Sequence, residues 1–185
     1  MAYMLLACFF IAERLLRRGS DAVSLEAGTT DRGTTRRIGR AFGIGLVALV
    51  ASPLLNRQRV GGIKAPGMAW AGVAAMVIGL FLRVWAARVL GAFYTRTLRT
   101  SATQHLVEDG PYRLVRHPGY LGVLLLWLGA GAATANALAV GLITVSMGRA
   151  YEARIHTEEA MLAKTFGPEY LRYVDHTWRL IPFVY

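Results

Sequence analysis

Residues Pro118–Gly148 have the sequence PGYLGVLLLWLGAGAATANALAVGLITVSMG, which contains no acidic residue and no lysine, arginine or histidine. A single helix over this stretch would be roughly 45 Å long, whereas the hydrocarbon core of a bilayer is about 30 Å thick. The sequence ATAN at residues 133–136, in the middle of the stretch, suits a turn. We therefore predict a helical hairpin whose second arm continues past Arg149 to about Phe166, where Gly167-Pro168 ends it.

Three further apolar runs precede the hairpin, at Met1–Leu16, Ile38–Leu55 and Met68 to about Leu90. Hydrophobic residues make up 55% of the 185 residues and charged residues 17%, more apolar surface than a water-soluble domain of this length needs to bury. The pattern predicts an all-α polytopic membrane protein with about five transmembrane helices, of which the last two form the hairpin. We expect residues 1–185 to form a single membrane domain, with three helices in residues 1–90 and the catalytic core in residues 91–185.

The formal net charge of +10 comes from basic residues that flank the apolar runs. A nucleic-acid-binding protein would gather them on one polar domain, so we expect no nucleic-acid partner. Basic loops beside apolar spans are typical of the cytoplasmic face of a membrane protein. The clusters at residues 14–40, at 96–116 and after 149 lie on one side if the N-terminus is outside. We therefore expect the C-terminus and the site in the cytoplasm, and a polar loop at residues 17–37.

Two arginines, Arg83 and Arg88, lie near the end of the third apolar run, with Trp85 between them. In one interpretation they extend to the membrane interface, with Trp85 in the headgroup belt. In the other, Arg83 lines a polar cavity, because ionisable residues within membrane segments usually serve a function. The sequence leaves both interpretations open.

The hairpin brings polar residues from its two arms together. Gly119 to Thr134 descends roughly 22 Å, and the same length of helix from Asn136 reaches about Tyr151. Arg116 and His117 should therefore lie beside the helix segment 154–159, which carries an arginine, a histidine and two glutamates. Such a cluster suits a zwitterionic ligand, whose carboxylate binds Arg or His and whose ammonium or hydroxyl groups bind Glu. A salt-bridge network that only closes the hairpin is the alternative.

Two motifs in the second half of the chain resemble a known family. GPYRLVRHPGYLG at 110–122 resembles the GPYR-x-x-RHP-x-Y-x-G signature of the isoprenylcysteine carboxyl methyltransferase and phospholipid methyltransferase group. RIHTEEAMLAKTFGPEYLRY at 154–173 resembles its R-x-x-x-E-E-x-x-L-x-x-x-F-G-x-x-Y-x-x-Y run. Residues 90–95 and 181–183 are also similar to family segments, so the resemblance covers about Leu82 to Tyr185.

The resemblance implies a small membrane methyltransferase that uses S-adenosylmethionine, bound against the cytoplasmic ends of the last helices. The residues that the resemblance places on the cofactor are Arg116, His117, Gly119, Tyr120, Gly122, Glu158 and Glu159. Each type also has a structural interpretation. The glycines permit close helix packing, and Tyr120 suits a membrane interface.

Methyl transfer from a sulfonium is an in-line displacement that needs alignment more than acid–base chemistry. The acceptor presents a carboxylate, a thiolate or an amine, and we expect it to enter from the bilayer. The candidates for orienting a carboxylate are, in order, Arg83, Arg154 and Arg116; His117 or Glu159 would serve as a base for a protonated acceptor. Prenylated protein is the namesake substrate of the family, and a lipid, a small thiol or another apolar acid fits equally well.

Two other functions compete with methyl transfer. Membrane sterol and steroid reductases carry a similar Arg-His-Pro-x-Tyr-x-Gly element and bind NADPH, but Glu158-Glu159 followed by Phe166-Gly167 favours the methyltransferase. A non-enzymatic membrane scaffold would use the cluster only as structure.

We expect no metal site, because Cys8 is the single cysteine and no two histidines have the spacing of metal ligands. The Gly43-Ile44-Gly45 sequence lacks the third glycine of a dinucleotide loop, which indicates helix packing.

Overall fold

The structure is a computed structural model that describes residues 1–16, 31, 33–65, 67–91 and 106–185. Its helices are α1 (Ala2–Leu16), α3 (Thr34–Arg57), α4 (Met68–Leu90), the short 3-10 helix η2 (Gly110–Arg113), α5 (Pro118–Ala133), α6 (Ala137–Phe166) and α7 (Pro168–Asp175). No strand occurs in these ranges, which contain only two isolated β-bridges. All five apolar helices that the sequence predicts are present. Most of the predicted loop at 17–37, and residues 92–95 of the family-like segment 90–95, lie outside the described residues.

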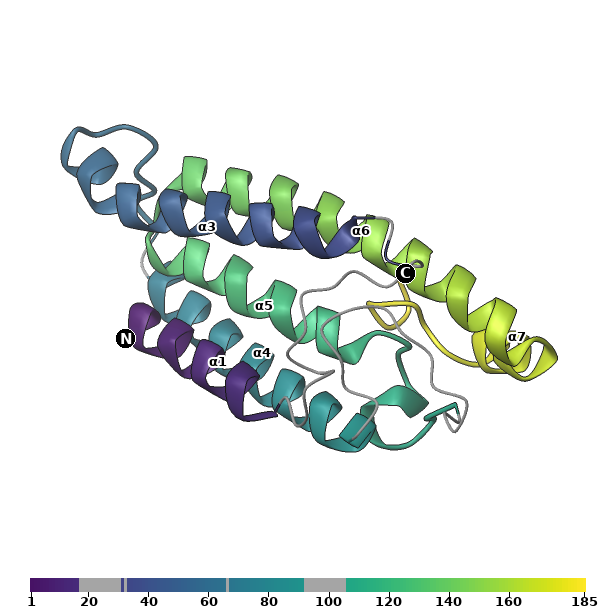
Figure 1. The fold of residues 1–185 in the computed structure, drawn as a ribbon. Helices are drawn as coiled ribbons and strands as arrows, with labels where there is room; N and C mark the ends of the chain where they lie inside the picture. Colours follow the sequence, from purple (N-terminus) through teal and green to yellow (C-terminus); the bar gives the residue numbers. More distant parts are fainter. Residues whose placement is uncertain (17–30, 32, 66, 92–105) are drawn as a thin grey trace.

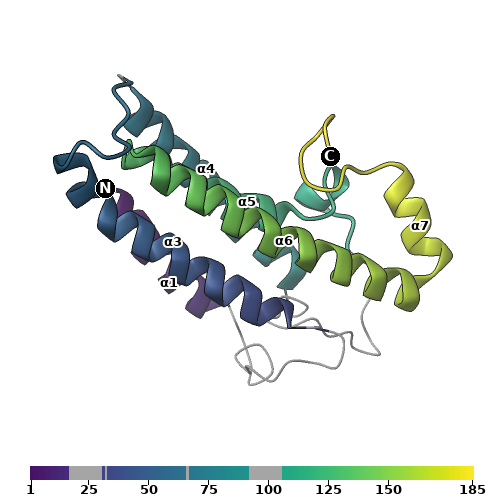
Figure 2. The same ribbon diagram turned by 90° about the horizontal axis from the view of Figure 1, so that it is seen from above.

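The five apolar helices lie side by side in one bundle, and α7 lies at one end of it (Figures 1 and 2). Helix α5 lies in the middle, with α4 and α1 on one side of it and α6 and α3 on the other (Figure 1). Its fully buried Leu126 and Trp127 pack among Met76, Ile143 and Met147. Among the described helices, α3 and α4 are long and apolar enough to cross a membrane, and α5 is apolar but shorter.

Helix α3 begins four residues before the predicted apolar run. Asp31 explains this start, because its carboxylate accepts hydrogen bonds from the Thr35 amide and from the Thr34 hydroxyl, at 3.1 and 3.0 Å. These bonds satisfy donors at the N-terminus of the helix, where the backbone has no partner of its own. The two arginines that follow therefore lie within the helix instead of preceding it.

Helix α3 also continues through Pro53 to Arg57, although the sequence places its end near the proline. A proline inside a helix leaves the carbonyl four residues earlier without its amide donor. Here that carbonyl belongs to Leu49, and the Tyr3 hydroxyl of α1 donates to it at 3.0 Å. A neighbouring helix therefore replaces the lost hydrogen bond.

The predicted hairpin of α5 and α6 is confirmed, with its turn at residues 134–136. Asn136 caps α6, since its side-chain oxygen accepts from the amides of Leu138 and Ala139 at 3.1 and 3.2 Å. Its amide nitrogen donates to Asn56 Oδ1 at 2.7 Å and to the Val60 carbonyl at 2.9 Å. The side chain of this fully buried asparagine thus has all its hydrogen-bonding capacity used, and it ties the turn to the end of α3.

Four glycines bring α4 and α5 into backbone contact. A Cβ atom on Gly79 would lie 2.5 Å from the Gly122 carbonyl oxygen, and one on Gly129 would lie 2.5 Å from that of Gly72. Larger side chains at these positions would hold the helices apart. Gly122 therefore has a packing role, and its contact with α4 aligns that helix with the first turn of α5.

Candidate functional site at the open end of the hairpin

The polar residues of the two hairpin arms meet as the spacing predicts. Arg116 Nε donates to Glu159 Oε1 at 3.1 Å, and the Tyr120 hydroxyl donates to Glu158 Oε2 at 2.6 Å. Both contacts join the start of α5 to the protruding part of α6. The structure therefore places these four side chains in one cluster at the end of the bundle away from the hairpin turn.

His117 lies beside these four side chains and is buried, with 5% of its surface exposed. Its ring stacks on Tyr120, with 5.4 Å between the ring centres and 7° between the planes. Nε2 lies 3.5 Å from Glu159 Oε1, without the alignment of a hydrogen bond, and it has no hydrogen-bonding partner within the described part of the chain. Buried polar atoms of this kind are rare, and each needs an explanation, such as a catalytic role or a bound water molecule or ion.

Glu159 is held by two arginines. In addition to Arg116, Arg179 approaches it, with Nε 3.2 Å from Oε1 and Nη2 3.0 Å from Oε2. Burial alone would raise the pKa of Glu159, but the nearby His117, Arg116 and Arg179 lower it to about 2. A carboxylate with this pKa stays ionised at neutral pH and is a weak base, so Glu159 is better suited to fixing geometry than to removing a proton.

Glu158 is in a different situation. Its side chain is 25% exposed, and Oε2 accepts from Tyr120 and lies 3.7 Å from His117 Nδ1. Oε1 accepts no hydrogen bond from any described residue. Glu158 therefore keeps acceptor capacity that a ligand's ammonium or hydroxyl groups can use.

The C-terminal segment docks onto the Arg-His-Pro motif, a contact that the sequence does not predict. The amides of Arg116 and His117 donate to the carbonyls of Trp178 and Arg179 at 2.8 and 3.2 Å, and the Trp178 amide donates to the Leu114 carbonyl at 3.0 Å. Arg116 Nη1 also donates to the carbonyls of Val174 and Thr177. The Arg116 guanidinium thus binds the chain's own C-terminal segment as well as Glu159.

Arg154 is buried, with 3% of its surface exposed, and it forms an ion pair with Asp31 at 2.5 Å. Nη1 also donates to the hydroxyls of Thr34 and Thr35 at 2.9 and 3.2 Å, and Nε donates to Tyr120 at 3.1 Å. Asp31 was not among the site residues predicted from the sequence. The signal for it was an acidic residue three positions before Thr34-Thr35, which is typical of a helix N-terminus.

Arg83 is largely buried and pairs with a carboxylate of α1. Its Nε donates to Glu13 Oε1 at 2.7 Å, and the two side chains are 14% and 7% exposed. A Cβ atom on Gly119 would lie 2.9 Å from Arg83 Nη1, so the guanidinium adjoins the first turn of α5. Arg88, by contrast, is exposed. Glu13 was the missed partner, and its signal was a charge inside an apolar run.

No group of three or more His, Cys, Asp or Glu side chains that would hold a metal ion occurs within the described ranges. Arg83 and Gly119 lie on the α4 side of α5, and Glu158 and Glu159 come from α6. The site residues expected from the sequence therefore all lie around the N-terminus of α5, with Gly122 one turn further along.

A family model described as phospholipid methyltransferase matches residues 68–169, more than half of the chain. The chain belongs to this family. The match covers α4, α5, α6 and the start of α7, and so includes both arms of the hairpin and the whole cluster except Arg179 and the residues before α4.

Several known proteins are similar to the chain. A probable protein-S-isoprenylcysteine O-methyltransferase of Oryza sativa subsp. indica is 33% identical over 119 residues, which are 63% of this chain and 62% of the rice protein. Protein-S-isoprenylcysteine O-methyltransferase A of Arabidopsis thaliana is 31% identical over 61% of this chain and 58% of its own length. The cobalt-zinc-cadmium resistance protein CzcN of Cupriavidus metallidurans is 31% identical over 80% of this chain and 65% of its own length.

A solved structure of a eukaryotic intramembrane Ras methyltransferase, isoprenylcysteine carboxyl methyltransferase, has the same fold, with a TM-score of 0.69. It is 22% identical, and the match covers 97% of this chain and 64% of that chain. The chain spans about 60% of the length of the plant relatives. These matches make the protein a member of a membrane methyltransferase family and give no support to the reductase or the scaffold alternative.

Proposed function

We propose that this protein is a membrane methyltransferase that transfers a methyl group from S-adenosylmethionine to a carboxylate, or to a thiol or amine, of a lipophilic acceptor. The observation that carries the proposal is the buried His117 ring, which stacks on Tyr120 and lies between the two glutamates, with Nδ1 3.7 Å from Glu158 Oε2 and Nε2 3.5 Å from Glu159 Oε1. Nε2 has no hydrogen-bonding partner among the described residues. Isoprenylcysteine-type carboxyl methylation is the activity that the plant relatives' names describe.

The side chains of the cluster fit this cofactor. S-adenosylmethionine, when bound, supplies an electrophilic methyl group on a sulfonium. Glu158 offers a carboxylate oxygen for an ammonium or a ribose hydroxyl, and His117 offers a buried nitrogen for a carboxylate or hydroxyl group. Glu159 and Arg116 hold the cluster together by contacts with each other and with the C-terminal segment.

Arg83 is the residue that we propose for orienting the acceptor. Arg154 pairs with Asp31 and Arg116 with Glu159, as Arg83 pairs with a carboxylate of its own, so the position of Arg83 is what distinguishes it. Arg83 lies beside Gly119 on the side of the bundle that α1 and α4 form, and its guanidinium already holds a carboxylate, that of Glu13. An arginine that pairs with a carboxylate side chain has the geometry to pair with a carboxylate acceptor.

We propose that α1, α3, α4, α5 and the first part of α6 cross the bilayer as one domain. The N-terminus then lies outside, and the site and the C-terminus lie in the cytoplasm. The basic residues at the site end of the bundle support this orientation. An acceptor with a prenyl or other apolar chain would enter the site laterally from the bilayer.

The first test is thermal unfolding of the purified protein in detergent with S-adenosylhomocysteine or NADPH. A ligand at 100 times its Kd stabilises a protein by about 2.7 kcal/mol, so S-adenosylhomocysteine should raise the Tm and NADPH should not. His117→Ala should remove this shift. His156→Ala, which changes an exposed histidine on α6, should retain it. A shift with NADPH alone would refute the proposal.

Transfer of labelled methyl to a small S-prenylated cysteine with a free carboxylate tests the reaction. The product should release its label in base, as an ester does, and the methyl ester of the same compound should accept no label. Arg83→Gln should raise the acceptor KM about tenfold or more, because one charge-assisted hydrogen bond is lost. Label on a base-stable product would indicate a different acceptor group.

A further inference from the structure

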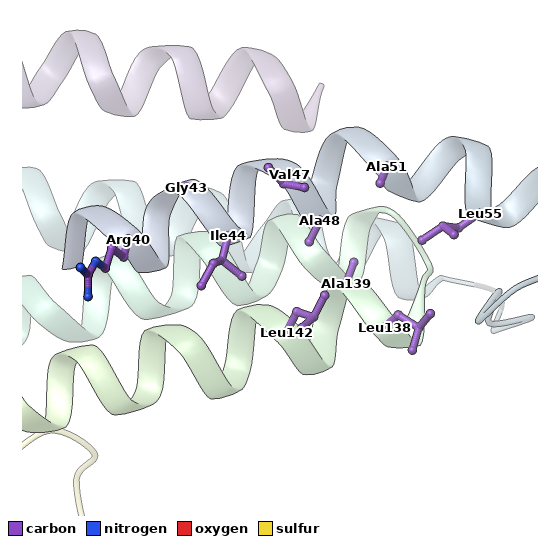
Figure 3. Close-up of a pocket in the computed structure, with 10 residues that line it drawn as sticks. All are labelled: Arg40, Gly43, Ile44, Val47, Ala48, Ala51, Leu55, Leu138, Ala139 and Leu142. Atoms are coloured by element: carbon purple, nitrogen blue, oxygen red, sulfur yellow. The ribbon is translucent and has the colours of Figure 1, made fainter. Parts of the chain in front are cut away.

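An apolar groove of about 560 Å³ runs between α3 and α6 on the outside of the bundle (Figure 3). Leu55 and Leu138 lie at one end of it, and Ile44 and Leu142 lie further along. Nine of the ten residues that line it are apolar, and the tenth is Arg40 at the other end. The groove is distinct from the proposed acceptor side, because Arg83 and Glu13 lie on α4 and α1, across the bundle (Figure 1).

Basic side chains gather at the Arg40 end of the groove. Arg36 and Arg37 precede Arg40 by one turn of α3, and all three are exposed. On α6, Leu142, Ser146 and Arg149 follow one face of the helix at spacings of four and three, so Arg149 continues the face that lines the groove. These four arginines form no ion pair with a carboxylate in the described part of the chain.

Arg40 and Arg149 lie at the same level of the bundle. Helices α3 and α6 are antiparallel, and Arg154 Nη1 contacts Thr34 Oγ1 at 2.9 Å. Arg40 lies roughly 9 Å from Thr34 along the axis of α3, and Arg149 lies roughly 7.5 Å from Arg154 along the axis of α6. Both distances run in the same direction, towards the hairpin turn. The two residues therefore lie at the same end of the groove, Arg40 in its lining and Arg149 one turn or more beyond it on α6.

We propose that this groove binds one anionic phospholipid of the surrounding bilayer, with its phosphate on Arg40 and Arg149 and an acyl chain along the groove. The chain has roughly 22 Å of α3 to lie against, from Arg40 to Leu55. A hydrocarbon chain matches the apolar lining, and arginines bind phosphate oxygens well. A second positive charge beside the phosphate favours a lipid with net negative charge over a zwitterionic one.

The test is native mass spectrometry of the full chain, released from nanodiscs of phosphatidylcholine that contain graded amounts of phosphatidylglycerol. The native protein should retain one phosphatidylglycerol in preference to phosphatidylcholine. Arg40→Gln and Arg149→Gln should each weaken this retention about fivefold. Arg57→Gln, which changes an exposed arginine at the opposite end of α3, should leave it unchanged.

A second pair of variants tests the groove itself. Gly43 lines the groove, and a Cβ atom there meets nothing within 4 Å, so Gly43→Leu starts in open space and places its side chain in the groove. It should abolish the preferential retention. Gly39→Leu, at an exposed position of α3 that is equally open and does not line the groove, should preserve it.

Equal retention of both lipids, or full retention by Gly43→Leu, would overturn the proposal. It would also be overturned if Gly43→Leu raised the KM of the methyl acceptor while lipid retention persisted, because the groove would then hold the acceptor chain. A dimer that dissociates in Gly43→Leu and retains no lipid would assign the groove to a second copy. The measurements of lipid retention and oligomeric state do not depend on methyl transfer being the protein's activity. Only the comparison of KM depends on it.

Discussion

Glu158 and Glu159 are neighbours in sequence, but a helix rotates each residue by about 100° from the last, so they face different surroundings. Glu159 points at Arg116 and Arg179, and Glu158 points at Tyr120 and keeps one oxygen without a partner among the described residues. The family motif contains both residues and does not distinguish them. From this difference we propose a ligand-binding role for Glu158 and a positioning role for Glu159.

Glutamine substitutions separate these roles. Glu159→Gln should lower the free energy of unfolding by about 2 kcal/mol, because it weakens charged hydrogen bonds to two arginines. Glu158→Gln should leave that energy nearly unchanged and weaken S-adenosylhomocysteine binding about tenfold. Thermal unfolding and ligand titration of both variants check this. Equal effects of the two substitutions on both measurements would contradict the assignment.

The low pKa of Glu159 predicts an acid-dependent loss of stability. Glu159 lies 22 residues beyond the start of α6, roughly 33 Å along the helix and thus beyond a hydrocarbon core of about 30 Å. Its pKa falls from 4.5 to about 2 in the folded protein, so folding favours the ionised form. The resulting stabilisation is complete above pH 4.5 and is lost as the pH falls towards 2.

The measurement is the Tm difference between the native protein and Glu159→Gln at several pH values. The difference should be constant above about pH 5 and should shrink below pH 4.5, because glutamine does not titrate. Comparing the two proteins at each pH cancels the titration of all other carboxylates. A difference that stays constant to pH 3 would show that Glu159 does not carry this effect.

At the scale of elements, the glycine contacts between α4 and α5 set the position of Arg83. A Cβ atom on Gly122 would lie 2.8 Å from the Arg83 amide nitrogen, so the backbones touch at the residue that we propose for the acceptor. A change in the spacing of these two helices would therefore move Arg83 relative to Gly119 and His117.

Gly79→Ala tests this packing. The new methyl group would overlap the Gly122 carbonyl, so we expect a loss of about 2 kcal/mol in unfolding free energy, and a raised acceptor KM. Gly141→Ala on α6 is the matched control, because a Cβ atom there meets nothing within 4 Å. It should be neutral or stabilising by up to about 1 kcal/mol, since alanine favours helix. Equal Tm values for the two variants would rule out the packing role.

At the scale of the whole molecule, three segments outside the hairpin form ion pairs at the site end of the bundle. Asp31 pairs with Arg154, Glu13 of α1 pairs with Arg83 of α4, and Arg179 of the C-terminal segment pairs with Glu159. Each pair joins residues that are at least 20 positions apart. They connect the N-terminal helix, the start of α3 and the chain's end to a single centre.

Removing one member of the most buried pair should be costly. Asp31→Asn removes the Asp31 carboxylate from the buried Arg154 guanidinium, and we expect a loss of about 3 kcal/mol in unfolding free energy. The double variant Asp31→Asn with Arg154→Met should recover part of that loss, because both charges of this pair are then removed together. Thermal unfolding of the two single variants and the double variant measures the coupling. Additive losses would show that the pair contributes no coupling energy.

Hydrophobic pattern and helix length sufficed to predict several features from the sequence. The apolar stretch 118–148 is too long for one crossing, so it folds back at its only turn-like sequence, and equal arm lengths bring Arg116 and His117 to Glu158 and Glu159. These are local rules of rise per residue and of helix termination. They predicted α4 at its observed bounds, the hairpin turn, and the end of α6 before Gly167.

Only the tertiary structure decided which charges pair. From the sequence alone, Arg83 is equally compatible with an interface position and a buried one. Its partner becomes known only when α1 is placed, because Glu13 of that helix then lies 2.7 Å from it. The same holds for Arg154 with Asp31, and for the division of roles between the two glutamates. Such contacts join residues far apart in the chain, and their energies depend on burial and alignment, which a pattern of residue types along one chain does not specify.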